Sequence, residues 1–300
     1  MKTDRESRRF LDPEVAARLS RMDIKARLVV EGFVAGLHKS PYRGFSVEFA
    51  EHRQYMPGDP LRHVDWKVYA KSDKFYVKEY EEETNLRAYL LLDASGSMGY
   101  GSGAVTKFVY AAQLAAALSY LMLRQRDSVG LVLFDKEVRR FLAPRASGVH
   151  LHRILRELEG ASPSEETNTA GALRRLTERI RRRGLVILLS DLMDDPDQVL
   201  TALRYFRHKK HEVVVFHILD PKEVRFDFTR EARFEDMERE DRLLAQPWRI
   251  QREYAREVER WRDRYRRECG EHRIDYNFIE TTTPYDTALY AYLAKRARLG

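Results

Sequence analysis

The middle of the chain alternates short apolar runs with longer segments whose apolar positions recur every three or four residues. The runs of strand length are Leu86–Asp93, Val129–Phe134, Leu185–Ser190 and Val213–Leu219. The segments with helical periodicity are Val105–Arg124, Val149–Leu158, Ala170–Arg182 and Pro196–His208. Strands that alternate with helices predict a parallel sheet with right-handed crossovers. The expected fold class is therefore α/β, a doubly wound and mainly parallel sheet with helices on both faces.

The two ends of the chain have other patterns. Helical periodicity runs through Asp12–Leu37, and short strands and turns are expected at Tyr42–Tyr80. Together they predict an N-terminal helix-and-strand module at residues 1–84. Residues 85–300 then form the main domain, with a hairpin and long-helix insertion at about 221–270. The hairpin pairs Ala232–Met237 with Arg242–Ala245, and the helix begins at Pro247. A last strand is expected at Ile274–Ile279 and a last helix at Tyr285–Ala297.

Polar residues follow two of the expected strands where each strand ends. Asp93 closes the first strand and precedes Ser95 and Ser97, Asp191 closes the third, and Thr167 stands at the start of a helical pattern. Carboxyl ends of parallel strands share one edge of a sheet, so these side chains can meet at one point. Carboxylate and hydroxyl oxygens are the ligands that Mg²⁺ or Mn²⁺ prefers, which predicts a divalent cation there.

Few ligands of this expected site are charged. The cation would therefore keep much of its positive charge and attract a carboxylate from outside. The alternative is that Asp93-Ala94-Ser95-Gly96-Ser97 is only a turn, because Asp, Ser and Gly are common turn residues.

The residues Asp93, Ser95, Ser97, Thr167 and Asp191 resemble the metal-ion-dependent adhesion site of the von Willebrand factor A domain. The resemblance implies a von Willebrand A-like fold in which Ser95, Ser97 and Thr167 ligate the metal and both aspartates act largely through water. It also implies an open coordination position that an acidic residue of a protein ligand fills.

One departure from that family is the pair Glu165 and Glu166, which stands where small residues often precede the Thr. In one reading, Glu166 caps the metal in the free protein and a partner's carboxylate displaces it. In the other, both side chains are solvated and favour the start of the following helix.

A second resemblance covers most of the chain. The segments Arg43–Phe49, Arg53–Asp59, Arg62–Lys67 and Phe234–Glu238 are similar to the bacterial family called domain of unknown function 58. The resemblance implies partnership with a MoxR-type AAA+ ATPase in assembling or activating other proteins, or in loading their cofactors. One polar block of this region has two readings; its residues are Arg53, Asp59, Arg62, Asp65 and Trp66. It can be a recognition surface. We favour the other reading, a structural network in which the arginines pair with the aspartates and Trp66 packs between the two domains.

Composition and charge narrow the classes of function. The formal charge is +7, but the cations lie in mixed-charge helices such as Arg249–Arg267, which are typical of solvated faces, so nucleic-acid binding is not expected. The single Cys269 excludes an intrachain disulfide. No apolar run has the length of a membrane span, and relatives with spans are common, so we expect a cytoplasmic protein.

Enzyme motifs are incomplete. Ser95 replaces the first Gly of G-x-S-x-G, no Walker Lys follows the loop glycines, and no general base stands beside the serines. The interpretation is a metal-dependent protein-binding adaptor, not an enzyme. A metal-dependent phosphoester hydrolase is the alternative, and a scaffold with a purely structural metal loop is the third possibility.

Overall fold

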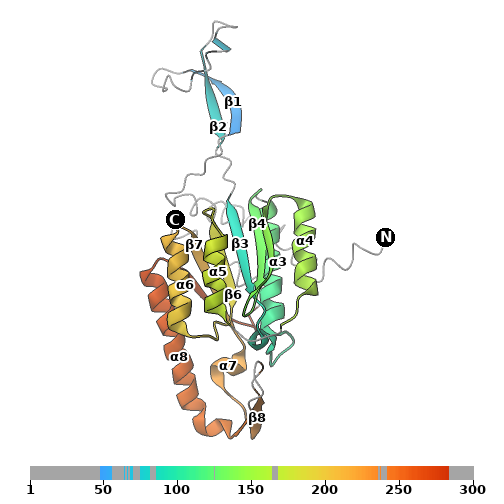
Figure 1. Ribbon diagram of the computed structural model, residues 1–300, viewed down its shortest axis with the longest axis vertical. Helices are drawn as coiled ribbons and strands as arrows, with labels where there is room; N and C mark the ends of the chain where they lie inside the picture. Colours follow the sequence, from blue (N-terminus) through green and yellow to red (C-terminus); the bar gives the residue numbers. More distant parts are fainter. Residues whose placement is uncertain are drawn as a thin grey trace, which may run out of the picture.

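A six-stranded sheet forms the centre of the computed structural model, which describes residues 48–55, 64, 66, 68–69, 75–81, 86–124, 126–163, 168–235, 237 and 242–283 (Figure 1). The strands are β3 (Arg87–Asp93), β4 (Ser128–Phe134), β5 (Val138–Arg145), β6 (Leu185–Ser190), β7 (Glu212–Leu219) and β10 (Asp275–Glu280). Their spatial order is β10-β7-β6-β3-β4-β5, and all neighbours are parallel except β4 and β5.

Helices cover both faces of this sheet. On one face α3 (Lys107–Arg124) and α4 (Gly148–Gly160) pack with strand residues such as Leu90 and Leu92. On the other, α5 (Thr169–Arg179), α6 (Pro196–His208) and α8 (Pro247–Glu271) pack with residues such as Leu91. Successive strand residues point to opposite faces, so a strand buried on both sides has the continuous apolar run seen in the sequence. The predicted doubly wound α/β fold is confirmed.

The apolar pattern missed one strand of the sheet. Strand β5 carries Arg139 and Arg140 and lies at the edge, antiparallel to β4. An edge strand is covered on one side only, so its polar residues hide it from a search for apolar runs. Gly130 of β4 lies against this strand, where an added Cβ would come within 2.6 Å of the Leu142 carbonyl oxygen.

The strand order reverses at β3. The chain adds β4 and β5 on one side of β3, then returns to place β6, β7 and β10 on the other. In open α/β sheets the crevice at the carboxyl ends of such neighbouring strands is where ligands bind. Asp93 is the last residue of β3, and Ser190 is the last residue of β6, so the sheet brings the two predicted strand ends to this crevice.

The predicted insertion lies at the same edge of the sheet. It contains α7 (Pro221–Arg225), the antiparallel pair β8 (Ala232–Glu235) and β9 (Arg242–Ala245), and then α8. Figure 1 shows α7 and β8 beyond the carboxyl ends of the strands. The sequence did not predict α7, a helix that begins with Pro221 and a reciprocal capping box between Asp220 and Glu223.

Other predictions fall partly or wholly outside the described residues. The helices expected at 12–37 and 285–297 lie outside them, while part of the 42–80 region is an antiparallel pair of β1 (Glu48–Gln54) and β2 (Tyr76–Glu81). Among the described residues, no helix is both long enough and apolar enough to cross a membrane.

Candidate metal site at the β3–β6 crevice

Asp93 is fully buried, and its carboxylate is held by groups from three segments. Its Oδ2 accepts hydrogen bonds from the Ser190 hydroxyl at 2.6 Å and the Thr169 hydroxyl at 3.3 Å, while Oδ1 accepts one from the Ser95 N–H at 3.0 Å. A second hydrogen bond joins the start of α5 to the loop that follows β6. The Ala170 N–H donates to the Asp194 carboxylate in that loop at 3.1 Å. The ends of β3 and β6 and the start of α5 therefore lie together, the last through Thr169.

The loop after Asp93 presents two hydroxyls side by side. Ser95 and Ser97 flank the start of a short 3₁₀ turn at Gly96–Gly99, and their Oγ atoms are 3.1 Å apart. Adjacent oxygens in the octahedral shell of Mg²⁺, at about 2.1 Å from the ion, are separated by about 3.0 Å. The observed spacing fits two neighbouring ligands of one cation. Ser95 is buried, whereas Ser97 is partly exposed.

Asp191 belongs to the same cluster but is already paired. Its Oδ2 accepts a hydrogen bond from the Lys107 ammonium at 2.7 Å, and Oδ1 accepts one from the Met193 N–H at 3.2 Å. Lys107 also contacts Glu223 at 2.5 Å. Sequence reasoning missed Lys107 and Glu223, and the signal that could have found Lys107 is a lone cation at the start of an otherwise apolar, Ala-rich helix.

Burial and like charge set the electrostatics of this cluster. Burial, together with repulsion from the Asp191 carboxylate, raises the pKa of Asp93 to about 7, although hydrogen bonds from Ser190 and Ser95 oppose the rise. Burial alone would lower the pKa of Lys107, but the carboxylates of Asp191 and Glu223 raise it above its usual value. Burial raises the pKa of Glu223, and Lys107 opposes that rise. The site thus holds more carboxylates than ammonium groups, and a further cation there would be attracted.

The donor set fits a weakly held, oxygen-coordinated cation. Within the described ranges, no group of three or more His, Cys, Asp or Glu residues could hold a metal, so the described ligands of a cation here would be serine hydroxyls and water. Oδ2 of Asp93 is occupied by two hydroxyls, and both oxygens of Asp191 already accept a hydrogen bond. Thr167, Glu165 and Glu166 lie outside the described residues.

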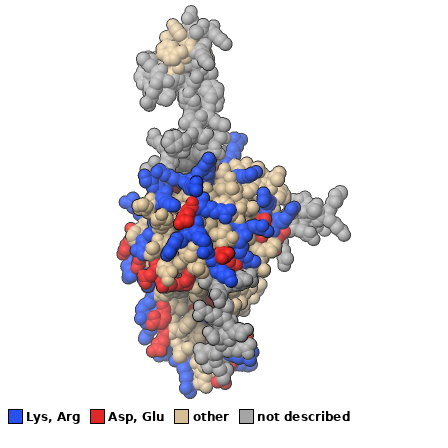
Figure 2. All heavy atoms as spheres, viewed as in Figure 1, with Lys and Arg blue, Asp and Glu red and all other residues tan. Residues whose placement is uncertain are grey.

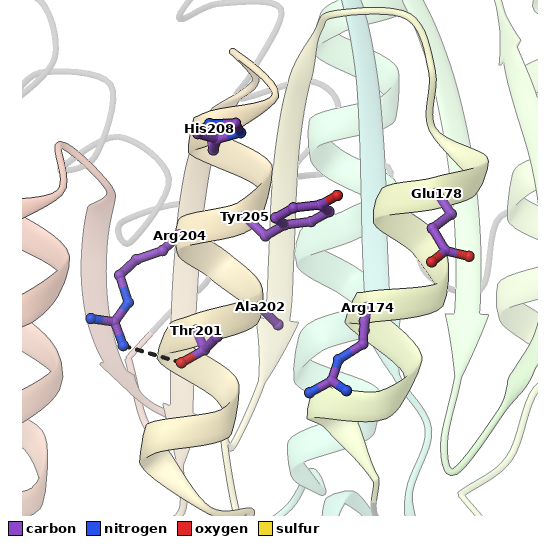
Figure 3. A pocket seen from close by; sticks show the side chains of 7 residues that line it. All are labelled: Arg174, Glu178, Thr201, Ala202, Arg204, Tyr205 and His208. Carbon is purple, nitrogen blue, oxygen red and sulfur yellow. Dashed lines mark hydrogen bonds between the residues drawn. The ribbon is translucent and has the colours of Figure 1, made fainter.

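A separate hollow lies on the outer surface between α5 and α6, away from the crevice. It has a volume of about 490 Å³ and lies between Arg174 and Glu178 of α5 and Tyr205 and His208 of α6 (Figure 3). Figure 2 shows Lys and Arg over this face with Asp and Glu among them. These four side chains are exposed, in contrast to the buried polar groups of the crevice.

The charges of α8 are arranged as the sequence predicted for a solvated face. Arg260 pairs with Glu257, and Arg266 pairs with Asp263, each at helical spacing. The favoured interdomain network would bury Trp66 between two domains. Trp66 is instead 56% exposed, and its ring contacts Tyr69 edge-on. Asp59, Arg62 and Asp65 lie outside the described residues, as does the side chain of Arg53.

Comparison with known families decides the relationship of the chain. The family model described as "Protein of unknown function DUF58" matches residues 51–272. The chain belongs to this family. Uncharacterized protein Rv1480 of Mycobacterium tuberculosis is 27% identical to this chain over 231 residues, which cover 76% of this chain and 72% of that protein. An uncharacterized protein of Mycobacterium bovis matches this chain over the same number of residues and with the same identity.

Several solved structures match parts of this DUF58 protein at low sequence identity. The conserved hypothetical protein BatB from Bacteroides thetaiotaomicron is 16% identical, with 71% of this chain and 99% of that chain covered and a TM-score of 0.46. The SpRpn10 VWA domain is 10% identical, with 70% and 95% covered and a TM-score of 0.40. Manganese-loaded TRAP protein from Plasmodium vivax is 23% identical, with 45% and 57% covered and a TM-score of 0.35.

Proposed function

We propose that this DUF58 protein is a metal-dependent, protein-binding adaptor that works with a MoxR-type AAA+ ATPase in assembling or activating client proteins. The observation that carries the proposal is the pair of hydroxyls of Ser95 and Ser97, 3.1 Å apart at the strand-order reversal and beside the buried Asp93. Such a pair has the spacing of neighbouring metal ligands, and it stands where an α/β sheet binds its ligand.

Each residue of the crevice has a role in this proposal. Ser95 and Ser97, with Thr167, would hold Mg²⁺ or Mn²⁺, and Asp93 and Asp191 would orient its water ligands. When bound, the cation supplies a positive charge with an open position for a carboxylate of the protein partner. Ser190 and Thr169 keep the Asp93 carboxylate in place, and Lys107 does the same for Asp191.

Turnover is not part of the proposal. In this proposal the described carboxylates of the cluster orient the water ligands of the cation and pair with Ser190, Thr169 and Lys107, and none is assigned the role of a general base. The phosphoester hydrolase would instead require a positioned base or nucleophile, and the structural-loop alternative would require that partner binding be independent of metal.

The test uses the purified full chain and a MoxR-type ATPase from the same genome, with affinity measured in Mg²⁺ and in EDTA. We expect association in Mg²⁺, loss in EDTA, and loss in Ser97→Ala. Ser128→Ala, at the amino end of β4 and the opposite edge of the sheet, is the matched control and should bind as the wild type does. Equal association in Mg²⁺ and in EDTA would reject the adaptor proposal.

A second assay separates the adaptor from the hydrolase. The metal-loaded protein should not hydrolyse ATP or a generic phosphomonoester. A phosphatase or ATPase rate that persists on further purification and disappears in Ser97→Ala would favour the hydrolase instead.

A further inference from the structure

Lys107 is the first residue of α3, and its fully buried ammonium is shared between two carboxylates. Its Nζ lies 2.7 Å from Oδ2 of Asp191, in the loop after β6, and 2.5 Å from Oε1 of Glu223, in α7. A buried charge is tolerated only when it is paired and hydrogen-bonded. Lys107 therefore joins the candidate metal site to the first element of the insertion.

Glu223 is itself held from the other side. Its Oε2 accepts a hydrogen bond from the Asp220 N–H at 2.8 Å. The Asp220 carboxylate in turn accepts hydrogen bonds from the N–H of Ser102 at 2.8 Å and from its hydroxyl at 2.5 Å. This chain of contacts restrains Glu223, so the ammonium of Lys107 has a defined position relative to Asp191.

The insertion also contacts the serine loop through a residue that follows β8. An added Cβ on Gly99, the last residue of the 3₁₀ turn that carries Ser97, would lie 3.2 Å from Cε of Met237. Met237 follows β8, so the insertion meets this part of the molecule once through Glu223 and once through Met237. Lys107 thus lies in a part of the molecule that the insertion contacts at two points.

The pairing with Lys107 limits what Asp191 can do. Each carboxylate oxygen can accept two hydrogen bonds, and each oxygen of Asp191 already accepts one, so each can still accept a bond from water. A cation bound directly by either oxygen of Asp191 would lie close to the Lys107 ammonium, which is 2.7 Å from Oδ2, and the repulsion between the two cations in this buried site opposes direct contact.

We infer that Lys107 is a positioning residue of the candidate metal site: it restricts Asp191 to water-mediated contact and, through Asp191, lowers the affinity of the site for a divalent cation. This inference rests on the proposed function, because it concerns the same cation. A cation without Asp191 as a direct ligand keeps more positive charge, which is the property that attracts the carboxylate of a partner.

The first experiment is a double-mutant cycle on the full chain, with Mn²⁺ affinity measured by calorimetry. Lys107→Met should bind Mn²⁺ at least about tenfold more tightly, since a nearby positive charge is removed and Asp191 is released. In an Asp191→Asn background the same change should tighten binding by several-fold less than in the wild type, because only the direct repulsion by the ammonium is then removed. Glu223→Gln is the matched control, because it cuts the same network on the side away from the cation, and it should not tighten binding.

The second experiment counts the water ligands of bound Mn²⁺ by electron paramagnetic resonance in water enriched with oxygen-17. Wild type and Asp191→Asn should hold equal numbers of waters, whereas Lys107→Met should hold one fewer because Asp191 enters the coordination shell. The comparison of wild type with Asp191→Asn needs no change at Lys107, so it tests the inference even if Lys107→Met fails to fold. Lys107→Gln, which keeps hydrogen-bond donors, is the second variant.

The outcomes separate the inference from the proposed function. Absence of Mn²⁺ binding by the wild type would reject both. Mn²⁺ binding with unchanged or weaker affinity in Lys107→Met, or equal tightening in the Asp191→Asn background, would reject the positioning role alone. An extra water in Asp191→Asn relative to the wild type would also reject it, since Asp191 would then be a direct ligand.

Discussion

The hydroxyl of Ser190 donates a hydrogen bond of 2.6 Å to Oδ2 of Asp93, across the boundary between β6 and β3. The two residues are 97 positions apart in sequence, and each is the last residue of its strand. This bond fixes one oxygen of the buried carboxylate, so Oδ1 is the oxygen that faces the serine loop and accepts the Ser95 N–H. The orientation of Asp93, on which the candidate metal site depends, is thus set by a neighbouring strand.

Ser190→Ala should weaken Mn²⁺ binding by about 10- to 100-fold, the usual effect of removing a group that orients a metal ligand. The reason is that Asp93 loses one of the hydroxyls that hold it, and a methyl group cannot replace that bond. Calorimetric titration measures the change, with Ser128→Ala as the control at the opposite edge of the sheet. Wild-type affinity in Ser190→Ala would show that the orientation of Asp93 does not matter to the cation.

Glu166→Ala tests whether a local carboxylate occupies the metal in the free protein. If Glu166 caps the cation, its removal should leave Mn²⁺ binding largely intact and tighten association with the ATPase partner, because the internal competitor is gone. Glu165→Ala is the natural control, one residue earlier in the chain and farther from Thr167. Unchanged or weaker partner affinity in saturating Mg²⁺ would mean that Glu166 only favours the start of the helix.

Two buried tyrosines predict opposite effects of the same substitution. The Tyr265 hydroxyl is buried and has no hydrogen-bond partner in the part of the chain that the structure describes, whereas the Tyr276 hydroxyl lies 2.6 Å from Nδ1 of His217. Tyr265→Phe should raise the free energy of unfolding by up to about 1 kcal/mol, and Tyr276→Phe should lower it by about 1–3 kcal/mol. Urea denaturation of both variants measures the two effects, and a fall in stability for Tyr265→Phe would contradict the assignment of its hydroxyl.

Asp127 should make the protein less stable as the pH rises. Burial raises the pKa of this carboxyl to about 7, opposed by the hydrogen bond that its Oδ1 accepts from the Leu86 N–H at 3.2 Å. The folded state therefore keeps a proton that the unfolded chain loses near pH 4, so stability falls as pH rises from about 4 to about 7 and stays low above it. A pKa difference of about 3 corresponds to at most about 4 kcal/mol.

Asp127→Asn keeps an acceptor for the Leu86 N–H but cannot ionise. Its stability relative to the wild type should therefore increase from pH 5 to pH 8, by about 2–3 kcal/mol over that interval. Urea unfolding at the two pH values measures this difference. A difference between variant and wild type that is the same at both pH values would show that Asp127 does not ionise in this range in the folded state.

Much of the sheet could be predicted because its signal is local. Strands buried on both faces leave unbroken apolar runs, so β6 was predicted with its observed bounds, and α6 likewise from its repeat and its Pro start. The placement of Asp93 and Asp191 at strand ends then followed, since parallel strands share their carboxyl edge. Polar edge strand β5 and short helix α7 carry no such run, and both were missed.

The sequence by itself placed Asp93 and the end of β6 at the crevice, because the carboxyl ends of parallel strands share one edge of the sheet. The tertiary structure decided which of them pair there. Lys107 meets Glu223 across 116 positions, and Thr169 reaches Asp93 across 76, only because α3, α5 and α7 pack around the same strand ends. Periodicity records how each element faces the core, but it carries no information on how the ends of different elements meet, and those meetings set the charge and the free coordination capacity of the site.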